Sequence, residues 1–160
     1  MALTPAQIQT LKTAINADPT LSAYPNTFDG AYDMSVYLEG ATSPAFIVWK
    51  SLVTITETGK QFNGTEWAGM TSANHTRLQT VAQWLTGGYN AALADIRAMF
   101  NDIWSGAGGT TTRANLLALW KRTANKGEKI FATGTGSDAS PAVLVVEGKI
   151  DYNDIFKARN

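Results

Sequence analysis

Three small residues near the end of the chain have the spacing of a phosphate-binding loop. In the stretch FATGTGSDASPA, Gly134, Gly136 and Ala139 form the pattern G-x-G-x-x-A. This pattern binds a dinucleotide when a strand leads into the glycine turn and a helix follows, because the pyrophosphate then meets the amides of the helix N-terminus. Here a predicted helix precedes the glycines and a predicted strand follows them, so the order is reversed. We therefore interpret Gly134 as a helix C-cap residue and residues 135–140 as a flexible connector, and we expect no cofactor.

The histidine and the carboxylates do not form a recognisable catalytic set. His75 is the only histidine, and nothing in the sequence resembles the nucleophile elbow of a serine hydrolase. A structural zinc site is not expected, because the chain has no cysteine. Paired carboxylates could hydrolyse a glycosidic bond, as in a small muramidase. The candidates are Glu39, Glu57, Glu66 and Glu147. No feature selects one pair of them, so we expect no catalytic residue and keep a hydrolase as an alternative.

Most of the locally unbalanced positive charge lies on a helix predicted over residues 112–131. Its basic residues are opposed only by Glu128, and they are Arg113, Lys121, Arg122, Lys126 and Lys129. At about 100° per residue, Arg122, Lys126 and Lys129 share one face. A solvated helix face is the plain interpretation, and the alternative is a face that docks an acidic partner or a nucleic-acid backbone. The whole chain has 13 basic and 13 acidic side chains, which argues against nucleic acid as the main ligand.

Length and composition indicate one folded domain. The chain has 160 residues, of which 44% are hydrophobic, and this is enough to bury a core without disulfides. The N-terminus lacks the basic and apolar regions of a secretory signal. No apolar run approaches the ~20 residues that cross a bilayer. We therefore expect a soluble protein made in the cytosol, with no contact with a membrane.

Periodicity and capping residues predict a mainly helical body. The first helix follows a capping box formed by Thr4 and Gln7 and ends before Pro19. The other predicted helices cover residues 28–39, 78–86, 89–104 and 112–131. Residues 43–59 combine a helix start with strand-forming side chains, and we favour a helix there. Residues 59–73 are expected to be a surface loop.

The C-terminal part differs in character from this body. The stretch PAVLVVEGKI predicts a strand or short hairpin, and DYNDIFKARN predicts a terminal helical turn capped by Asp151. The predicted fold is therefore a mainly α bundle of five to six helices with a small C-terminal β strand or hairpin arm. Its parts are a helical body over residues 1–132 and, over residues 133–160, a glycine-rich connector, a β-prone arm and a short helix.

Both ends of the chain resemble one family of proteins. The segments LTPAQIQTLKTAINADPTLSAYPNTFDGAY, SPAFIVWK and EKIFATGTGSDASPAVLVVEGKIDYNDI are similar to small proteins encoded in the virion gene clusters of tailed bacteriophages. The most similar blocks are residues 26–32 and 128–148, and the resemblance does not extend to residues 56–112. It implies a non-enzymatic virion component of the head–tail junction or upper tail.

The resemblance and the residue patterns together predict an assembly protein located in the virion. Its expected partners are further copies of itself in a ring and the portal, neck or tail proteins, with transient contact with DNA. An extended segment can add a strand to a neighbouring subunit, so the C-terminal arm is expected to join subunits. The candidate interface residues are Arg122, Lys126, Lys129, Thr135, Ser137, Val143, Val145, Glu147 and Tyr152.

Overall fold

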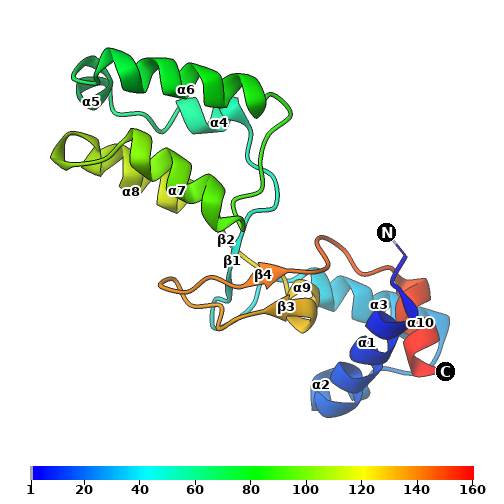
Figure 1. Cartoon of the computed structure of the whole chain (residues 1–160). Helices are drawn as coiled ribbons and strands as arrows, with labels where there is room; N and C mark the ends of the chain where they lie inside the picture. The colour runs from blue at the N-terminus through cyan, green and yellow to red at the C-terminus, as the bar shows by residue number, and fades with distance from the viewer. Residues whose placement is uncertain (1) are drawn as a thin grey trace. The chain divides into compact units, whose positions relative to one another are not determined.

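The structure, a computed structural model that describes residues 2–160, is mainly helical, as predicted (Figure 1). The helices in the described range are α1 (Pro5–Ala17), α2 (Pro19–Ser22), α3 (Phe28–Glu39), α4 (Ile55–Gly59), α5 (Gly64–Ala68), α6 (Ser72–Trp84), α7 (Ala94–Ile103), α8 (Thr110–Leu119), α9 (Lys126–Phe131) and α10 (Tyr152–Arg159), with a 3-10 turn η1 (Ala107–Gly109). The strands are β1 (Ile47–Trp49), β2 (Lys121–Thr123), β3 (Ala132–Thr133) and β4 (Val143–Leu144). They form two two-stranded sheets, β1 with β2 and β3 with β4.

The chain divides into two compact units, and the second is inserted into the first. Unit 1 consists of the residues up to Val48 together with Thr123–Asn160, and unit 2 is the continuous segment Trp49–Arg122. The chain passes from one unit to the other within β1 and returns within β2. This division differs from the predicted boundary between residues 132 and 133, and two helical units replace the predicted single bundle.

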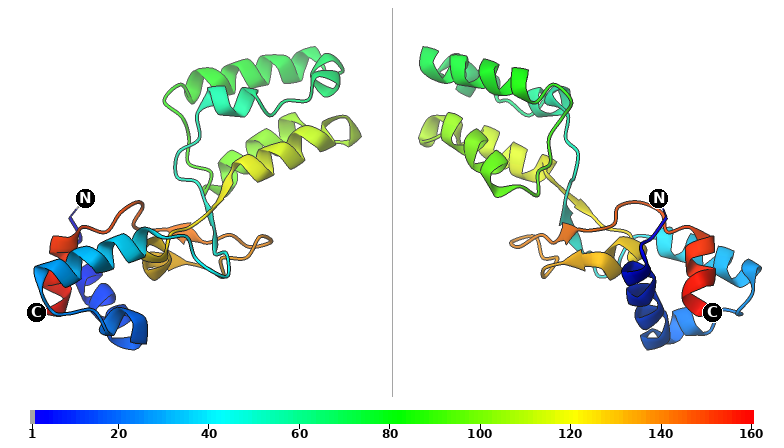
Figure 2. Two further views of the ribbon diagram at one scale, coloured as in Figure 1. Left: turned by 180° about the vertical axis from the view of Figure 1, so that it is seen from behind. Right: turned by 45° about the vertical axis from the view of Figure 1, so that its right-hand side comes forward.

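Unit 1 is built around α1, α3 and α10. Helix α10 packs against both α1 and α3, and the two views of Figure 2 show it beside α1. The buried apolar residues of this core come from both ends of the sequence: Leu11, Ile15, Leu21, Ala31, Met34, Leu38, Phe131, Val146, Ile150, Ile155 and Ala158. The C-terminal segment is thus part of the core of unit 1, whereas the sequence predicted a separate arm.

A buried carboxylate attaches the C-terminal segment to α9. Glu128 is 2% exposed, and its Oε1 atom accepts a hydrogen bond of 2.9 Å from the Gly148 amide. Its Oε2 atom accepts another of 3.0 Å from the amide of Asn125, the N-cap residue of α9. Because a buried carboxylate is stable only when it is hydrogen-bonded, this contact favours the folded-back position of residues 142–160.

The helix starts of unit 1 follow the predicted capping chemistry. The Thr4 hydroxyl accepts from the Gln7 amide, and the Gln7 side chain accepts from the Thr4 amide, so the predicted capping box is confirmed. The Thr27 hydroxyl accepts from the Gly30 amide at the start of α3, and the Asp151 carboxylate accepts from the Asn153 amide at the start of α10. These side chains satisfy amides that have no partner within their helices.

Unit 2 has a separate, aromatic-rich core. Tyr89, Phe100, Trp104 and Trp120 lie in it together with Val53, Leu78, Val81, Ala91, Ile103 and Leu116. The Tyr89 hydroxyl lies 2.7 Å from the Thr58 hydroxyl and accepts a 2.9 Å hydrogen bond from the Trp120 indole. All three of these side chains are buried, so the core contains a polar network whose members satisfy one another.

Two predictions for residues 43–73, which cross from unit 1 into unit 2, are wrong. The helix favoured over residues 43–59 is replaced by β1 and then by α4, whose capping box uses Thr54 and Glu57. The surface loop predicted at residues 59–73 contains α5, which Asn63 caps. The strand-forming residues Ile47, Val48 and Trp49 therefore outweighed the helix-start signal at Ser43-Pro44.

The prediction of one long helix over residues 112–131 is also wrong. The structure has α8, β2 and α9 in its place. The Trp120 carbonyl accepts from the Lys50 amide at 2.8 Å, and the Ala124 amide donates to the Phe46 carbonyl at 2.9 Å. Backbone groups that would continue the helix thus bond to a different segment, and Asn125 then caps a new helix.

Candidate interaction surfaces

The predicted basic face does not exist as one surface. Arg122 lies in β2 at the end of unit 2, whereas Lys126 and Lys129 lie in α9 of unit 1. Both lysines line a pocket of about 340 Å³ in unit 1. The Lys126 ammonium lies 3.5 Å from the centroid of the Tyr37 ring, and that of Lys129 lies 5.6 Å from the centroid of Phe46. The prediction of a shared helical face for Arg122, Lys126 and Lys129 is therefore wrong.

The glycine-rich connector forms a defined turn between β3 and β4. The Thr135 hydroxyl donates to the Ser140 carbonyl at 3.0 Å and lies 3.3 Å from the Ser137 hydroxyl. Gly136 has φ +66°, and a Cβ atom there would lie 2.2 Å from the Phe46 ring. The loop connects two strands, and Ala132 is the C-cap residue of α9, so the prediction of Gly134 as the helix C-cap is wrong.

The remaining predicted interface residues lie in two different places. Val143 and Val145 are exposed residues in and just after β4, with Glu147 two residues further on. Strand β4 pairs with β3 of its own chain, with Thr133 opposite Val143. The β-prone segment therefore has a partner within unit 1, whereas the sequence predicted an arm extended toward a neighbour. Tyr152 lies at the start of α10.

Tyr152 belongs to an exposed aromatic patch on α3 and α10 of unit 1. Phe28 stacks on Phe156 with ring centroids 4.0 Å apart. Tyr152 lies edge-on to both Phe28 and Tyr32, at 6.5 and 6.3 Å. Phe28 and Tyr32 are each 54% exposed, and Val36 on the next turn of α3 is 49% exposed. We call Phe28, Tyr32, Val36 and Tyr152 the aromatic patch.

An acidic edge adjoins the aromatic patch. At about 100° per residue, Phe28, Tyr32 and Val36 occupy one arc of α3, and Asp29 and Asp33 continue the same arc. Both aspartates are exposed, and among residues 2–160 neither forms an ion pair with a basic side chain. We call Asp29 and Asp33 the acidic edge.

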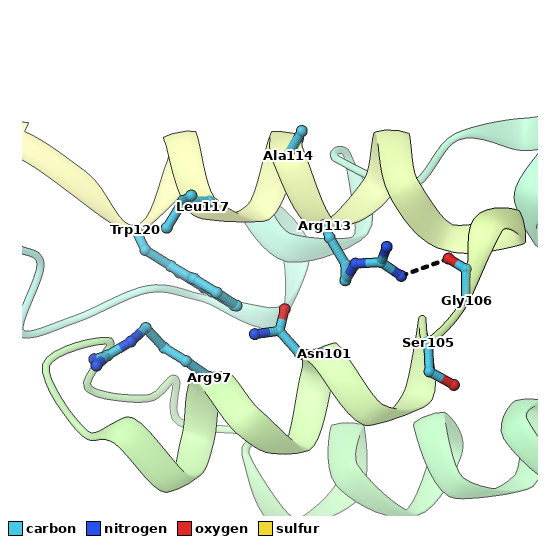
Figure 3. A pocket seen from close by; sticks show the side chains of 8 residues that line it. All are labelled: Arg97, Asn101, Ser105, Gly106, Arg113, Ala114, Leu117 and Trp120. Atoms are coloured by element: carbon cyan, nitrogen blue, oxygen red, sulfur yellow. Dashed lines mark hydrogen bonds between the residues drawn. The ribbon is translucent and has the colours of Figure 1, made fainter. Parts of the chain in front are cut away.

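Unit 2 carries a pocket with two arginines, which lies between α7 and α8 (Figure 3). Its volume is about 510 Å³. Asn101 lies between Arg97 of α7 and Arg113 of α8, and the apolar wall consists of Ala114, Leu117 and Trp120. We call this the arginine pocket.

Backbone carbonyls and an aromatic ring hold both guanidinium groups in place. Arg97 donates to the Ala91 carbonyl, and its guanidinium carbon lies 4.0 Å from the centroid of the Trp49 ring. Arg113 donates to the Trp104 carbonyl and, at 2.9 Å, to the Gly106 carbonyl. In the described part of the chain neither arginine has a carboxylate partner. Burial lowers the pKa of Arg97, yet an arginine stays protonated at neutral pH.

Three of the four glutamates considered as catalytic candidates, Glu39, Glu57 and Glu66, make hydrogen bonds or ion pairs within the fold. Hydrogen bonds from the Thr54 backbone and hydroxyl lower the pKa of Glu57. Desolvation raises the pKa of Glu66, but hydrogen bonds from Thr112 and Thr111 outweigh it and lower the pKa to about 2. Glu39 pairs with Lys149. A general acid in glycoside hydrolysis needs a raised pKa, so the shifts of Glu57 and Glu66 have the wrong direction.

Neither a metal cluster nor a membrane span is present in the described part of the chain. Residues 2–160 contain no group of three or more metal-ligating side chains. Within the same range, no helix has the length and apolar character needed to cross a bilayer.

Comparison with protein-family models, curated proteins and solved structures gave no match.

The aromatic patch and the arginine pocket include residues that sequence reasoning missed. Phe28, Tyr32 and Val36 recur every four residues, in addition to the buried set of α3. A helix with apolar residues on two faces is a signal that one of them meets a partner, and this signal was available. The position of Arg97 and Arg113 in one pocket could not be predicted, because it depends on how α7 lies beside α8.

Proposed function

We propose that this chain is a structural protein of a tailed-bacteriophage virion, and that it acts by binding other proteins at the head–tail junction or upper tail. In this proposal, copies of the chain form a ring or dock on one, next to portal, neck or tail proteins. Each of the two units is helical and has its own core, so each can present a defined surface to a partner. The protein is made in the host cytoplasm and resides in the virion.

The aromatic patch is the observation that carries this proposal. Exposed apolar side chains are ordinary when isolated, but a contiguous set of aromatic rings is typical of protein interfaces. The patch includes Phe28 and Tyr32, which fall within residues 26–32, one of the two blocks that most resemble the phage proteins. Both blocks lie in unit 1, whereas the segment without resemblance lies in unit 2.

The site chemistry supports an assembly role over the hydrolase alternative. Two of the four candidate glutamates accept hydrogen bonds that lower their pKa. The DNA-contacting alternative depended on a basic face of a helix over residues 112–131, and that helix is replaced by three elements. Contact through apolar surface is therefore better supported than either alternative.

The test is incorporation of the chain into virus particles. Density-gradient-purified particles from cells that encode the chain should contain it in stoichiometric amount by mass spectrometry. Replacing Tyr32 and Val36 with serine should lower incorporation by about tenfold or more, because central aromatic and aliphatic contacts carry most interface energy. Both residues are exposed, so the circular dichroism spectrum of the variant should match that of the wild type.

The matched control replaces Trp84 and Leu93 with serine. These are exposed apolar residues of unit 2, outside the aromatic patch, and their removal should leave incorporation unchanged. Absence of the wild-type chain from particles would contradict the proposal, as would equal loss in both variants.

A further inference from the structure

The neutral charge of the whole chain conceals opposite charges on its two units. Unit 1 has six basic and nine acidic side chains, which gives −3, and unit 2 has seven basic and four acidic side chains, which gives +3. Proteins whose surfaces carry opposite potentials attract one another at distances up to the Debye length, ~8 Å at physiological salt. The two units of one copy therefore carry net charges of opposite sign, and unit 1 of one copy attracts unit 2 of another.

The unpaired charged groups of the two units match in number and kind. Among residues 2–160, the two carboxylates of the acidic edge have no basic partner and the two guanidinium groups of the arginine pocket have no acidic partner. Asp29 and Asp33 are four residues apart, so their side chains lie one above the other on α3. Arginine binds carboxylates with paired, charge-assisted hydrogen bonds.

The apolar parts of the two surfaces match as well. The acidic edge adjoins Tyr32 and Val36, and the arginine pocket has a wall that includes Leu117, which is 42% exposed. The amide of Asn101 lies between the arginines and can bind a hydroxyl or carbonyl group. A nucleic-acid backbone would satisfy the guanidinium groups but would leave this apolar surface exposed, so an acidic protein surface fits better.

We propose that copies of this chain associate head to tail, with the acidic edge and aromatic patch of unit 1 of one copy seated in the arginine pocket of unit 2 of the next. The two surfaces differ, so each copy retains one free surface of each kind after pairing. Such an interface is heterologous, and it continues into a closed ring or an open filament. This inference rests on the proposed function in one respect. A ring subunit must bind other copies of itself, and this interface would provide that binding.

The test measures self-association of the full-length chain by sedimentation velocity over a range of concentrations and salt. The wild type should associate more as its concentration rises and less as salt is added, because the paired charges are screened. An acidic-edge variant, Asp29→Lys with Asp33→Lys, should weaken association by at least about tenfold. A pocket variant, Asn101→Glu with Leu117→Glu, should have the same effect, and it changes only exposed helix positions.

Mixing the two variants gives the sharpest outcome. Each variant retains the surface that the other has lost, so an equimolar mixture should form dimers but no larger species. A mixture that remains monomeric would overturn the proposal, as would variants that associate like the wild type or a wild type that is monomeric at every concentration. If the acidic edge instead bound the arginine pocket of its own chain, the mixture would remain monomeric, and the proposal of contact between copies would be wrong.

A matched control separates specific contact from net charge. Asp95→Lys with Asp102→Lys changes the charge by the same amount, and both residues lie on the side of α7 away from Arg97. This control should associate as the wild type does.

If a short DNA duplex occupies the pocket while the acidic-edge variant associates normally, the pocket binds nucleic acid and the proposal is wrong. Self-association in solution and presence in particles are separate measurements, so either proposal can fail while the other stands.

Discussion

At the scale of single residues, the polar network inside unit 2 is the feature most sensitive to one atom. The Tyr89 hydroxyl joins the Thr58 hydroxyl to the Trp120 indole through two hydrogen bonds. Tyr89→Phe removes one oxygen and leaves the buried indole N–H without a partner. We expect a loss of about 1–3 kcal/mol in the free energy of unfolding. Urea unfolding followed by tryptophan fluorescence measures it, and Tyr32→Phe, on the exposed aromatic patch, should have almost no effect.

Glu66 makes the stability of unit 2 dependent on acid. Its carboxylate accepts from the amides of Thr111 and Thr112 at 2.8 and 2.7 Å, so a side chain of α5 caps α8, whose own N-cap makes no side-chain bond. The pKa is lowered from 4.5 to about 2 in the folded state. The stabilisation is therefore present above the unfolded pKa and is lost as pH falls from about 4.5 to about 2.

The Glu66→Gln variant tests this dependence. The neutral amide cannot titrate, so the melting temperature of the variant should fall less than that of the wild type between pH 5 and pH 2.5. Melting curves at closely spaced pH values measure the difference. Parallel falls in the two proteins would show that other groups dominate the acid response.

At the scale of elements, capping chemistry was the most reliable guide from sequence. Thr4 and Asp151 each cap the helix predicted for them, because a cap acts over a few residues and needs no tertiary partner. The break between α8 and α9 could not be predicted in this way. It depends on backbone bonds to Lys50 and Phe46, which are far away in the sequence.

A glycine in α3 is required by a close backbone approach. A Cβ atom at Gly30 would lie 2.1 Å from the Pro25 carbonyl oxygen, whereas one at Gly59 in α4 would meet nothing within 4 Å. Gly30→Ala should destabilise the protein by about 1–3 kcal/mol through overpacking. Gly59→Ala should be neutral or stabilise by up to about 1 kcal/mol, because alanine favours the helix. Thermal unfolding of both variants measures the contrast, and equal effects would contradict the contact at Pro25.

At the scale of the whole molecule, each unit has its own hydrophobic core. Sequence reasoning identified the helical class but not this division, since the core of unit 1 joins Leu11 and Met34 to Val146 and Ile155. Local patterns carry no information about which distant segments meet. The α3 residues of the aromatic patch and the acidic edge could be predicted from a helical projection, because they lie on one helix. The arginine pocket could not, because it is formed by two helices.

Two deletions test this organisation in opposite directions. Replacing residues 49–122 with a short glycine–serine link should leave unit 1 folded, with a cooperative melt by far-ultraviolet circular dichroism. This shortened chain has no tryptophan, because all five lie in unit 2. Removing residues 133–160 instead should unfold unit 1, because Val146, Ile150 and Ile155 are part of its core. A truncated chain in which α1 and α3 remain folded would show that the C-terminal segment is dispensable.

The segment between the paired strands β1 and β2 forms unit 2, and its insertion at this one place affects how the gene can evolve. A stretch of gene encoding residues 49–122 can be exchanged for another, or lost, while the codons for unit 1 stay intact on either side. Selection can then modify the inserted module at a different rate from its host. Related chains would be expected to agree in unit 1 and to vary in length and content between their counterparts of Val48 and Thr123.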